Sequence, residues 1–516
     1  MKRIFEKVGM NKPKRSAFDL SHEVKTSCDW ADLNPIMCQE VVPGDQFSVN
    51  SEVLVRMAPT IAPVMHRVDV YVHHFFVPNR IIWSGWEDFI FPSDASGTLP
   101  VLPKLTVSSG TPIDRVDDKS LWARLGLPTL ASTQDLGQDF SVNALPFRAY
   151  QAIFNEYYRD ENLVAEVDLE GNTPQTDVGK LQRRAWEKDY FTSALPFAQK
   201  GPAVNLGLDI NYRDGSDVID TATGLPVVGP KEIGADSVGK LAPVDLITPP
   251  DTTYTLDNIE DASVTIEELR RGARLQEWLE RAARGGTRYK EALLSFFGVS
   301  AGDARLDRPE YLGGGRQPIT ISEVLNTTGI QQDAAQGAPQ GDMAGHGIAV
   351  GANNNFKYSI KEHGYIMSIM SILPKPSYQQ GIPRHFSYND RYDYYWKEFA
   401  NIGEQEVLNK ELYFQPTATT ANDVTFGYQQ RYAHYKYACN HTSGDMRSTL
   451  DFWHVGRKFT VPPALDETFI TPTEEDDLDR IFAVDAKTTG ANQFWVQVYN
   501  SVKARRPMPY FSNPRL

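Results

Sequence analysis

The stretch that most constrains the fold is residues 66–77, HRVDVYVHHFFV, because apolar and polar side chains alternate along it. One side carries Val68, Val70, Val72 and Phe76, and the other carries Arg67, Asp69, Tyr71 and His73. A period of two indicates a β-strand with one buried face, and Val, Tyr and Phe pack well on a pleated surface. The run over 47–57 alternates in the same way, and Pro59 and Pro63 lie between the two. Two long strands joined by a proline-rich turn predict the start of a β-sandwich.

Further strands are expected towards the end of the chain, at 356–361, 363–373, 424–432 and 494–502. The pattern in the middle of the chain predicts helices instead. They are expected at 83–90, from Pro146 onwards, after a capping box at 265–268, and at 289–297. Strands that come first and last must pair across the insertions between them, which is the logic of a Greek key and of a double-sheet jelly roll. We therefore predict a mainly β fold with long helical and loop insertions.

Composition excludes several classes of protein. A chain of 516 residues is too long for one simple core, and three cysteines without zinc-type spacing indicate free thiols in a reducing compartment. No run of about 18 apolar residues occurs, so we expect no membrane insertion. The first residues also lack the apolar core of a signal peptide. Synthesis and folding in a cytoplasm are expected.

Charge is unevenly distributed along the chain, whose formal net charge is −14. The first fifteen residues carry six bases and one acid, and the last fourteen carry Lys503, Arg505, Arg506 and Arg515 and no acid. Residues 205–262 carry eleven acids and three bases, without Phe or Trp. That segment cannot make a core and is expected at the surface. The basic ends are either solvated termini or arms that contact nucleic acid.

Patterns typical of enzymes occur in the wrong context. Residues 298–302 fit a nucleophile-elbow string around Ser300, but a helix is expected before the serine where the motif needs a strand. His73 and His74 are adjacent on a strand and face opposite sides, which favours ordinary strand histidines over a metal site. The acidic run 474–477 is interpreted as a solvated loop, with a weak calcium site as the alternative. We predict no catalytic, cofactor-binding or metal-binding residue.

The segment 384–396 interleaves basic and aromatic residues. Such a pattern can stack single-stranded bases. Tyr, Trp and Arg are equally the residues that anchor protein interfaces, and we favour the interface.

Ten short motifs are spread along the chain from one end to the other. They are CDWADLNPI (28–36), VPGD (42–45), HRVDVY (66–71), FFVPNR (75–80), LPFRAY (145–150), DYFTSALPFAQKGPA (189–203), ARGGTRY (283–289), FFGV (296–299), DARLDRPEYLGGG (303–315) and DRYDYYWKEFANIGEQ (390–405). Together they resemble the major capsid protein of Microviridae, the small icosahedral single-stranded DNA phages, and most closely its gokushovirus branch. The resemblance covers nearly the whole chain and is weakest at 205–262 and 329–355.

The resemblance implies an eight-stranded antiparallel jelly-roll β-sandwich of the viral capsid type. It implies a structural, non-enzymatic function, in which copies of the chain assemble into a T=1 icosahedral shell around circular single-stranded DNA. The expected partners are further copies, genomic single-stranded DNA, a small basic DNA-binding protein, a pilot protein, an internal scaffolding protein and a host cell surface receptor. Location in the virion follows, after synthesis in the cytoplasm of a bacterial host. A jelly-roll carbohydrate-binding or glycoside-active protein is the rival interpretation.

Two sets of residues are predicted to act in assembly. Contacts with single-stranded DNA are expected from Lys2, Arg3, Lys12, Lys14, Arg15, Lys503, Arg505 and Arg506. Subunit contacts are expected from Arg391, Tyr394, Tyr395, Trp396, Arg308 and Tyr311.

The chain is expected to divide into eight parts. They are a basic N-terminal arm (1–27), the first jelly-roll strands (28–80), a loop and helical insertion with possible middle strands (81–204), an acidic surface protrusion that contributes to host attachment (205–262), a helical insertion (263–325), a low-complexity loop (326–355), the remaining strands with their loops (356–502) and a basic C-terminal tail (503–516).

Overall fold

The computed structural model describes residues 15–90, 100–108, 110–112, 115–130, 138–171, 174, 176–201, 218–220, 233–235, 241–243, 254–256, 270–277, 280, 307–325, 343–417, 419–473, 476–483 and 491–511. The chain divides into two compact units, one formed by Met1–Phe197 with Gly302–Leu516 and the other by Ala198–Ala301.

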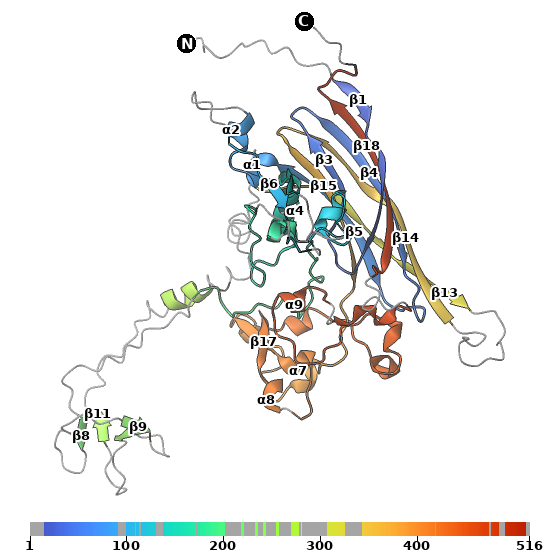
Figure 1. Cartoon of the computed structure of the whole chain (residues 1–516). Coiled ribbons are helices and arrows are strands. Elements are labelled where there is room, and N and C mark those ends of the chain that lie inside the picture. Colours follow the sequence, from blue (N-terminus) through green and yellow to red (C-terminus); the bar gives the residue numbers. More distant parts are fainter. Residues whose placement is uncertain are drawn as a thin grey trace. The chain divides into compact units, whose positions relative to one another are not determined.

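Two antiparallel sheets face each other in the first unit (Figure 1). The six-stranded sheet contains β1 (Ser16–Asp19), β2 (His22–Cys28), β4 (Gln46–Met57), β13 (Thr320–Leu325), β14 (Met343–Ser359) and β18 (Phe494–Arg506). Its order is β1-β18-β4-β14-β13, and β2 also pairs with β18. The four-stranded sheet has the order β12-β5-β15-β3 and contains β3 (Asn34–Val41), β5 (Val68–Pro78), β12 (Glu310–Pro318) and β15 (Gly364–Pro374). Strands from both ends of the sequence therefore lie side by side.

The core of the sandwich follows from alternation along the strands. Every second residue of β4 and of β18 is buried, and these residues pack against the facing side of β5 and β15. The contributors are Val53, Val55, Val496 and Val498 from one sheet and Val68, Val70, Val72, Met370 and Ile372 from the other. Burying one such side chain contributes about 1.5–3 kcal/mol to stability.

The second face of the four-stranded sheet is covered by a helical layer. This layer contains α1 (Asn79–Ile82), α2 (Trp86–Ile90), α3 (Leu121–Arg124), α4 (Leu145–Ile153) with a π-helical turn (Phe154–Tyr158), and the pair β6 (Lys104–Val107) and β7 (Phe140–Asn143). Phe75 and Val77 of β5 and Met367 and Ile369 of β15 share a buried cluster with α4. Both faces of this sheet are therefore covered.

A smaller lobe with its own core follows β15. It contains β16 (Glu404–Leu408), β17 (Thr425–Gln430), α7 (Asn409–Leu412), α8 (Thr419–Asn422) and α9 (Glu467–Ile470). Short 3₁₀ turns accompany it, at Arg384–Ser387, Lys397–Phe399, Ala433–Tyr435, Gly444–Arg447 and Asp451–Trp453, whereas the turn at Leu478–Ile481 packs into the core of the sandwich. Tyr190, Phe191, Val407 and Phe426 lie in its buried cluster.

The second unit contains two short antiparallel pairs. β8 (Val218–Asp220) pairs with β11 (Tyr254–Leu256), and β9 (Ile233–Ala235) pairs with β10 (Leu241–Pro243). Residues 270–277 are helical, as the capping box predicts, whereas the predicted helix at 289–297 and Ser300 lie outside the described residues.

Several boundaries expected from the sequence are wrong. Residues from Ser16 to Cys28 are strands β1 and β2 and not part of an arm, and β18 extends to Arg506, so Lys503, Arg505 and Arg506 lie in a strand and not in a tail. The helical insertion expected up to 325 ends in strands β12 and β13, and the loop expected up to 355 is strand β14 from Met343 onwards. The strand expected at 424–432 pairs with β16 in the lobe and not in the sandwich.

The surroundings of β5 also differ from the expectation of one buried face. Tyr71 and Asp69 are buried on the side predicted to be polar, because side chains of neighbouring segments, among them Arg184 and Lys375, lie over them. Asp69 forms an ion pair with Lys375, whose Nζ lies 3.2 Å from Asp69 Oδ2.

Candidate assembly and nucleic-acid contact surfaces

The lobe exposes an aromatic surface made of residues 386–396 and 432–437. Tyr394, Tyr395 and Trp396 are 57%, 55% and 48% exposed, and Phe386, Tyr435 and Tyr437 are exposed as well. The two segments are held together by Tyr432, whose hydroxyl donates to the Tyr394 carbonyl (3.0 Å) and accepts from the Trp396 amide (3.3 Å). These bonds hold the aromatic rings in place at the surface.

Four of the predicted interface residues lie together on this aromatic surface. The Arg391 guanidinium lies 4.8 Å from the centre of the Tyr392 ring, and Trp396 Nε1 donates to the Arg391 carbonyl (2.7 Å). Tyr395 packs edge to face on Tyr432 with ring centres 5.1 Å apart. Large contiguous apolar patches are uncommon on monomers, and Tyr, Trp and Arg anchor interfaces. The composition fits a contact with another protein.

Arg384 belongs to the same basic–aromatic segment but is used inside the lobe. Its Nη1 donates to Glu411 Oε1 (2.8 Å) and to the Glu406 carbonyl (2.6 Å). Glu411 is buried and also accepts from the Tyr190 hydroxyl (3.0 Å). Burial raises the pKa of the Glu411 carboxyl, while the Arg384 charge opposes that rise. Arg384 therefore anchors the segment instead of presenting a charge to a partner.

The other two predicted interface residues have different neighbours. Arg308 Nη1 forms an ion pair with Glu156 Oε1 (2.8 Å). Tyr311 on β12 packs against Phe75 and Tyr157, with ring centres 5.6 Å and 6.4 Å away. Tyr311 is 48% exposed and lines a hollow with Arg184, Glu187 and Lys188. These two residues therefore lie over the four-stranded sheet, whereas Arg391, Tyr394, Tyr395 and Trp396 lie on the lobe.

The residues predicted to contact DNA separate into three groups. Lys2, Arg3, Lys12 and Lys14 lie outside the described residues. Arg15, Lys503 and Arg505 are exposed, and β1 pairs with the end of β18, so that Ser16 lies opposite Arg506 and Asp19 lies opposite Lys503. Arg506 faces the other way, where its Nη2 lies 2.9 Å from Asp45 Oδ2 and 3.2 Å from the Glu40 carbonyl oxygen that it donates to.

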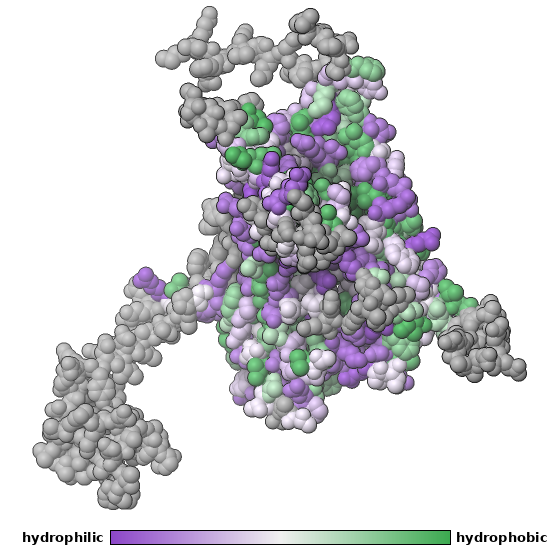
Figure 2. Space-filling model, in the orientation of Figure 1, coloured by the Kyte–Doolittle hydropathy of each residue, from purple (hydrophilic) through white to green (hydrophobic). Residues whose placement is uncertain are grey.

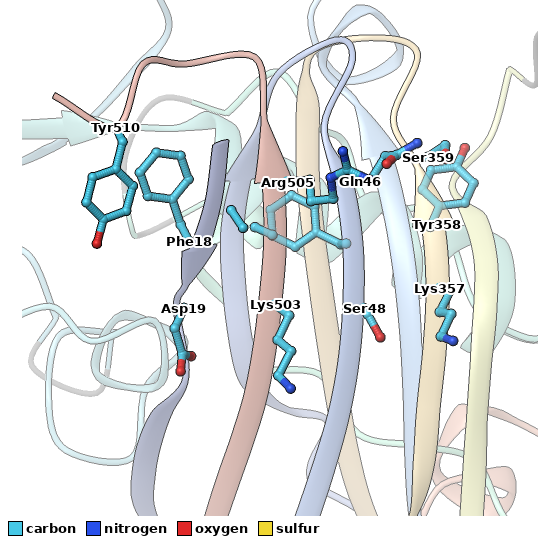
Figure 3. A pocket seen from close by; sticks show the side chains of 13 residues that line it. Phe18, Asp19, Gln46, Ser48, Lys357, Tyr358, Ser359, Lys503, Arg505 and Tyr510 are labelled. Atoms are coloured by element: carbon cyan, nitrogen blue, oxygen red, sulfur yellow. The ribbon is translucent and has the colours of Figure 1, made fainter. Parts of the chain in front are cut away.

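A groove near both ends of the described chain adds residues that sequence reasoning missed. Its cavity volume is about 670 Å³, and Phe18, Lys357, Lys503, Arg505 and Tyr510 line it (Figure 3). Alternation along 356–361 is a signal that places Lys357 on an outward face. The strand register that brings Lys357 near Lys503 is not visible in one sequence.

The histidines and acids singled out as metal candidates have structural partners. His74 is buried, and its Nε2 donates to the Asn354 carbonyl (3.2 Å) while Nδ1 accepts from the Ser368 hydroxyl (2.7 Å). Asp476 is buried beside Arg457 (3.1 Å), so at this residue the solvated-loop interpretation is wrong. Among the described residues no cluster of His, Cys, Asp and Glu could hold a metal ion. All three cysteines are free.

Comparison with known proteins gives one consistent result. A family model described as "Capsid protein (F protein)" matches residues 7–516. Relatives named "Capsid protein VP1" include that of Chlamydia phage 1, 33% identical over 600 aligned positions covering 100% of this chain and 98% of the relative. That of Bdellovibrio phage phiMH2K is 35% identical and covers 89% of both chains. That of Spiroplasma virus 4 is 30% identical over 97% of this chain and 95% of the relative. None of the described helices is long and apolar enough to cross a membrane.

Proposed function

This chain belongs to the capsid protein (F protein) family, and we propose that its copies close into a T=1 icosahedral shell around a circular single-stranded DNA genome. It is a structural major capsid protein and a component of the virion, and not an enzyme. The rival interpretation, a carbohydrate-binding or glycoside-active jelly roll, is not favoured by this membership. The T=1 geometry and the circular genome rest on the resemblance to gokushoviruses.

An eight-stranded jelly roll is part of this proposal, with β1 and β2 taken as one interrupted strand and β13 as an addition at the edge. One sheet then reads β1/β2, β18, β4, β14, and the facing sheet reads β3, β15, β5, β12. Each sheet has four strands, and connections cross repeatedly between the sheets, as two Greek keys require. This arrangement supports an eight-stranded capsid-type jelly roll.

The aromatic surface of the lobe is the observation that best supports assembly of copies into a shell. A subunit in a closed shell needs several different surfaces that contact neighbours related by symmetry. Tyr394, Tyr395 and Trp396 offer large rings that a neighbour would remove from water, and such rings commonly dominate the energy of an interface. We assign this surface, together with Arg391, to contacts between copies.

Electron microscopy of the purified full-length protein tests the assignment. Wild-type protein should form closed, uniform particles. The double variant Tyr394→Ala, Trp396→Ala should remain folded and lose particles, because truncating central aromatic anchors commonly costs about 2 kcal/mol or more each. Trp495→Ala is the matched control, since Trp495 is similarly exposed on β18. Normal particles from the double variant would refute the assignment of this surface.

Genome contact is assigned to the basic chain ends. β1 and the end of β18 are paired, which brings the start of β1, preceded by Arg15, to the strand end that carries Lys503 and Arg505, and the sequence adds Lys2, Arg3, Lys12 and Lys14 just before it. A polyanion inside a shell favours basic ends on the inside and acidic segments outside. Each phosphate neutralised on a single strand changes the slope of log affinity against log salt by about −0.7. A slope that stays unchanged after Gln replaces these bases would exclude the contact.

Residues 205–262 are assigned to an outer projection that contributes to host attachment. Their acidic composition disfavours contact with packaged DNA, and they lie within a compact unit of their own, Ala198–Ala301. Limited proteolysis of intact particles should cut here first. Resistance of this segment, with cleavage in the sandwich strands, would refute the assignment.

The remaining partners follow from the resemblance. They are a small basic DNA-binding protein, a pilot protein, an internal scaffolding protein and a host cell surface receptor, with synthesis in the bacterial cytoplasm. Mass spectrometry of purified virions tests for the DNA-binding protein and the pilot protein. Mass spectrometry of assembly intermediates tests for the scaffolding protein.

A further inference from the structure

A row of polar side chains crosses the middle of the sandwich core. In the six-stranded sheet, Asn500 on β18 lies opposite Ser51 on β4, which in turn lies opposite Asn354 on β14. In the facing sheet, Ser368 on β15 lies opposite His74 on β5, and their side chains are hydrogen-bonded (2.7 Å). All five residues are buried, and we call them the polar belt. Burying polar groups costs free energy unless they are bonded, so the belt needs a reason to be there.

Hydrogen bonds tie the belt together within one sheet and between the two sheets. The Ser51 hydroxyl donates to Asn500 Oδ1 (2.7 Å). Asn500 Nδ2 donates to the Ile36 carbonyl of β3, in the facing sheet (2.9 Å). His74 Nε2 donates in the opposite direction, to the Asn354 carbonyl (3.2 Å). The two sheets are therefore joined by directional bonds at a single level of the sandwich.

The belt divides the sandwich core into two apolar clusters. On each of four strands, the buried residue two positions before the belt and the one two positions after it belong to different clusters. These residues are Val49 and Val53 on β4, Val498 and Val502 on β18, Val72 and Phe76 on β5, and Ile366 and Met370 on β15. The belt is thus the polar interruption in an otherwise apolar interior.

The apolar pairs across β4 and β18 are nearly interchangeable, because Val49 pairs with Val502, Val53 with Val498 and Val55 with Val496. A slip of β18 by two residues would keep its buried face buried, since side chains alternate with a period of two. Depending on its direction, the slip would again pair valine with valine, Val53 with Val496 or Val55 with Val498. Ser51 and Asn500, in contrast, would each lie opposite a valine. A buried hydroxyl and amide without partners therefore oppose the slip.

Three strand pairings shift their register beside the belt. The shifts lie between Gly351 and Asn354 on β14, between Tyr311 and Gly313 on β12, and between Ser368 and Ile369 on β15. Each shift touches the belt, because Asn354 and Ser368 belong to it and Gly313 pairs with His74. A β-bulge fixes the point at which the pairing of two strands changes. The belt therefore lies at the level where the register of the sandwich is decided.

We propose that the polar belt sets the register of the sandwich, above all that of β18, because the native pairing is the one in which Asn500 meets Ser51. β18 follows the lobe in sequence and pairs with β1, β2 and β4 from the other end of the chain. A slip by two residues would move its side chains along β4 by about 7 Å. It would also separate Arg506 from Asp45. The register belongs to one folded chain, so the inference does not depend on how copies assemble.

Pairs of engineered cysteines in the full-length chain report the register. Gln497 lies opposite Leu54 on the open face, so Leu54→Cys with Gln497→Cys reports the native pairing. Glu52→Cys with Gln497→Cys reports a slip of two residues, because in the native register these positions are diagonal neighbours, too far apart for a disulfide. Each chain is refolded from urea in reducing buffer and then oxidised. Mass spectrometry of peptides identifies which cysteines are linked.

The belt variant Ser51→Val, Asn500→Leu should raise the slipped cross-link at least about fivefold over the chain with the native belt. The matched control Val53→Ala, Val498→Ala removes apolar side chains from the neighbouring row. It should lower the midpoint of urea unfolding without raising the slipped cross-link. The belt variant should lower that midpoint less than the control does, since apolar groups replace a bonded polar pair.

Two results would overturn the inference. They are a slipped cross-link that stays at its original level in the belt variant, and an equal rise in the belt variant and the control. If the belt variant does not fold, Ser51→Ala replaces it, because this change removes a single hydroxyl. A slipped cross-link from Ser51→Ala no greater than that from Val53→Ala would then reject the belt. Shell formation is not part of the readout, so either outcome leaves the proposed function standing.

Discussion

The two sheets of the sandwich share one core but differ in their second face. All eleven residues of β15 in the four-stranded sheet are buried, because α4 and its neighbours cover the side that points away from the core. In the six-stranded sheet, β18 alternates between buried and exposed residues along most of its length. Both faces of the covered sheet are therefore buried in packing that stabilises the fold, whereas the open sheet has one face available for contacts.

The side chains on the two second faces match this difference. The covered face carries His73 and Phe75 on β5, which pack against Tyr158 and Tyr311, and Tyr71, whose ring lies under the Arg184 guanidinium. The open face carries Trp495, Tyr499, Lys503 and Arg505 on β18, all exposed. Figure 2 also shows hydrophobic surface towards the free end of the β13–β14 pair, where Val324, Leu325 and Met343 are exposed. Exposure on the six-stranded sheet is thus a place to look for partners.

The largest expected effect is the loss of a buried charge on the covered face. Asp69→Ala removes the carboxylate that lies 3.2 Å from Lys375 Nζ and 3.6 Å from Arg67 Nε. Breaking a buried ion pair from one side commonly costs about 3–5 kcal/mol. Lys375 keeps a second carboxylate partner, Glu187, in this variant, so a loss at the lower end of that range is expected. Urea unfolding of the soluble variant measures this cost. A change below about 1 kcal/mol would mean that the face is not covered as described.

The next effect is the loss of apolar packing on the same face. Ile369→Ala should lower the free energy of unfolding by about 2–5 kcal/mol, since the side chain is fully buried against the helical layer. Val350→Ala on β14 is the matched control, because Val350 is 75% exposed and its truncation should change stability by at most about 0.5 kcal/mol. Equal losses from the two variants would erase the distinction between the sheets.

A pH-dependent effect is expected inside the sandwich, at His74. Burial lowers the pKa of His74 to about 4 from its ordinary 6.5, although the hydrogen bond to Asn354 opposes this. The unfolded chain therefore binds the proton between these values and the folded chain does not, so stability is lost as pH falls from about 6.5 towards 4. The steepest contribution is about 1.4 kcal/mol per pH unit.

His74→Gln tests this contribution, because a glutamine amide can also donate to the Asn354 carbonyl and accept from Ser368. Unfolding free energies at a series of pH values should show a flatter profile for His74→Gln than for wild type. The control is His346→Gln at an exposed position of β14, which should keep the wild-type profile. Identical profiles for wild type and His74→Gln would contradict the assignment.

Alternation alone predicts the long strands well. The expected ranges 47–57, 66–77 and 363–373 differ from β4, β5 and β15 by at most two residues at each end. β12 and the part of β14 before residue 356 could not be recognised, because glycine-rich sequence indicates loops. In the fold, a Cβ on Gly314 would lie 2.3 Å from the Val72 carbonyl oxygen, and one on Gly351 would overlap Gln317. These glycines permit close approach between strands, which is a tertiary requirement.

The functional surfaces were only partly predictable for the same reason. The aromatic segment 391–396 is local in sequence, so its composition identifies it. The groove depends on the pairing of β1, β4, β14 and β18, which are distant in sequence. Lys357 and Phe18 therefore carry no local signal that links them to Lys503. Arg506 shows the opposite case: its place near the basic end of the chain suggests a contact with DNA, but in the fold it forms an ion pair with Asp45.

The smallest expected effect concerns an ion pair on the open face. Glu23 and Lys25 lie on β2 with Lys25 Nζ 3.4 Å from Glu23 Oε1, and their side chains are 40% and 76% exposed. Exposed pairs contribute about 0.2–1 kcal/mol and are screened by salt. Glu23→Ala should therefore destabilise the chain by less than 1 kcal/mol in low salt, with a smaller difference at about 1 M salt, as measured by urea unfolding. A loss as large as that of Asp69→Ala, unchanged by salt, would show that something covers this part of the six-stranded sheet, and the contrast between an open and a covered face would then fail at β2.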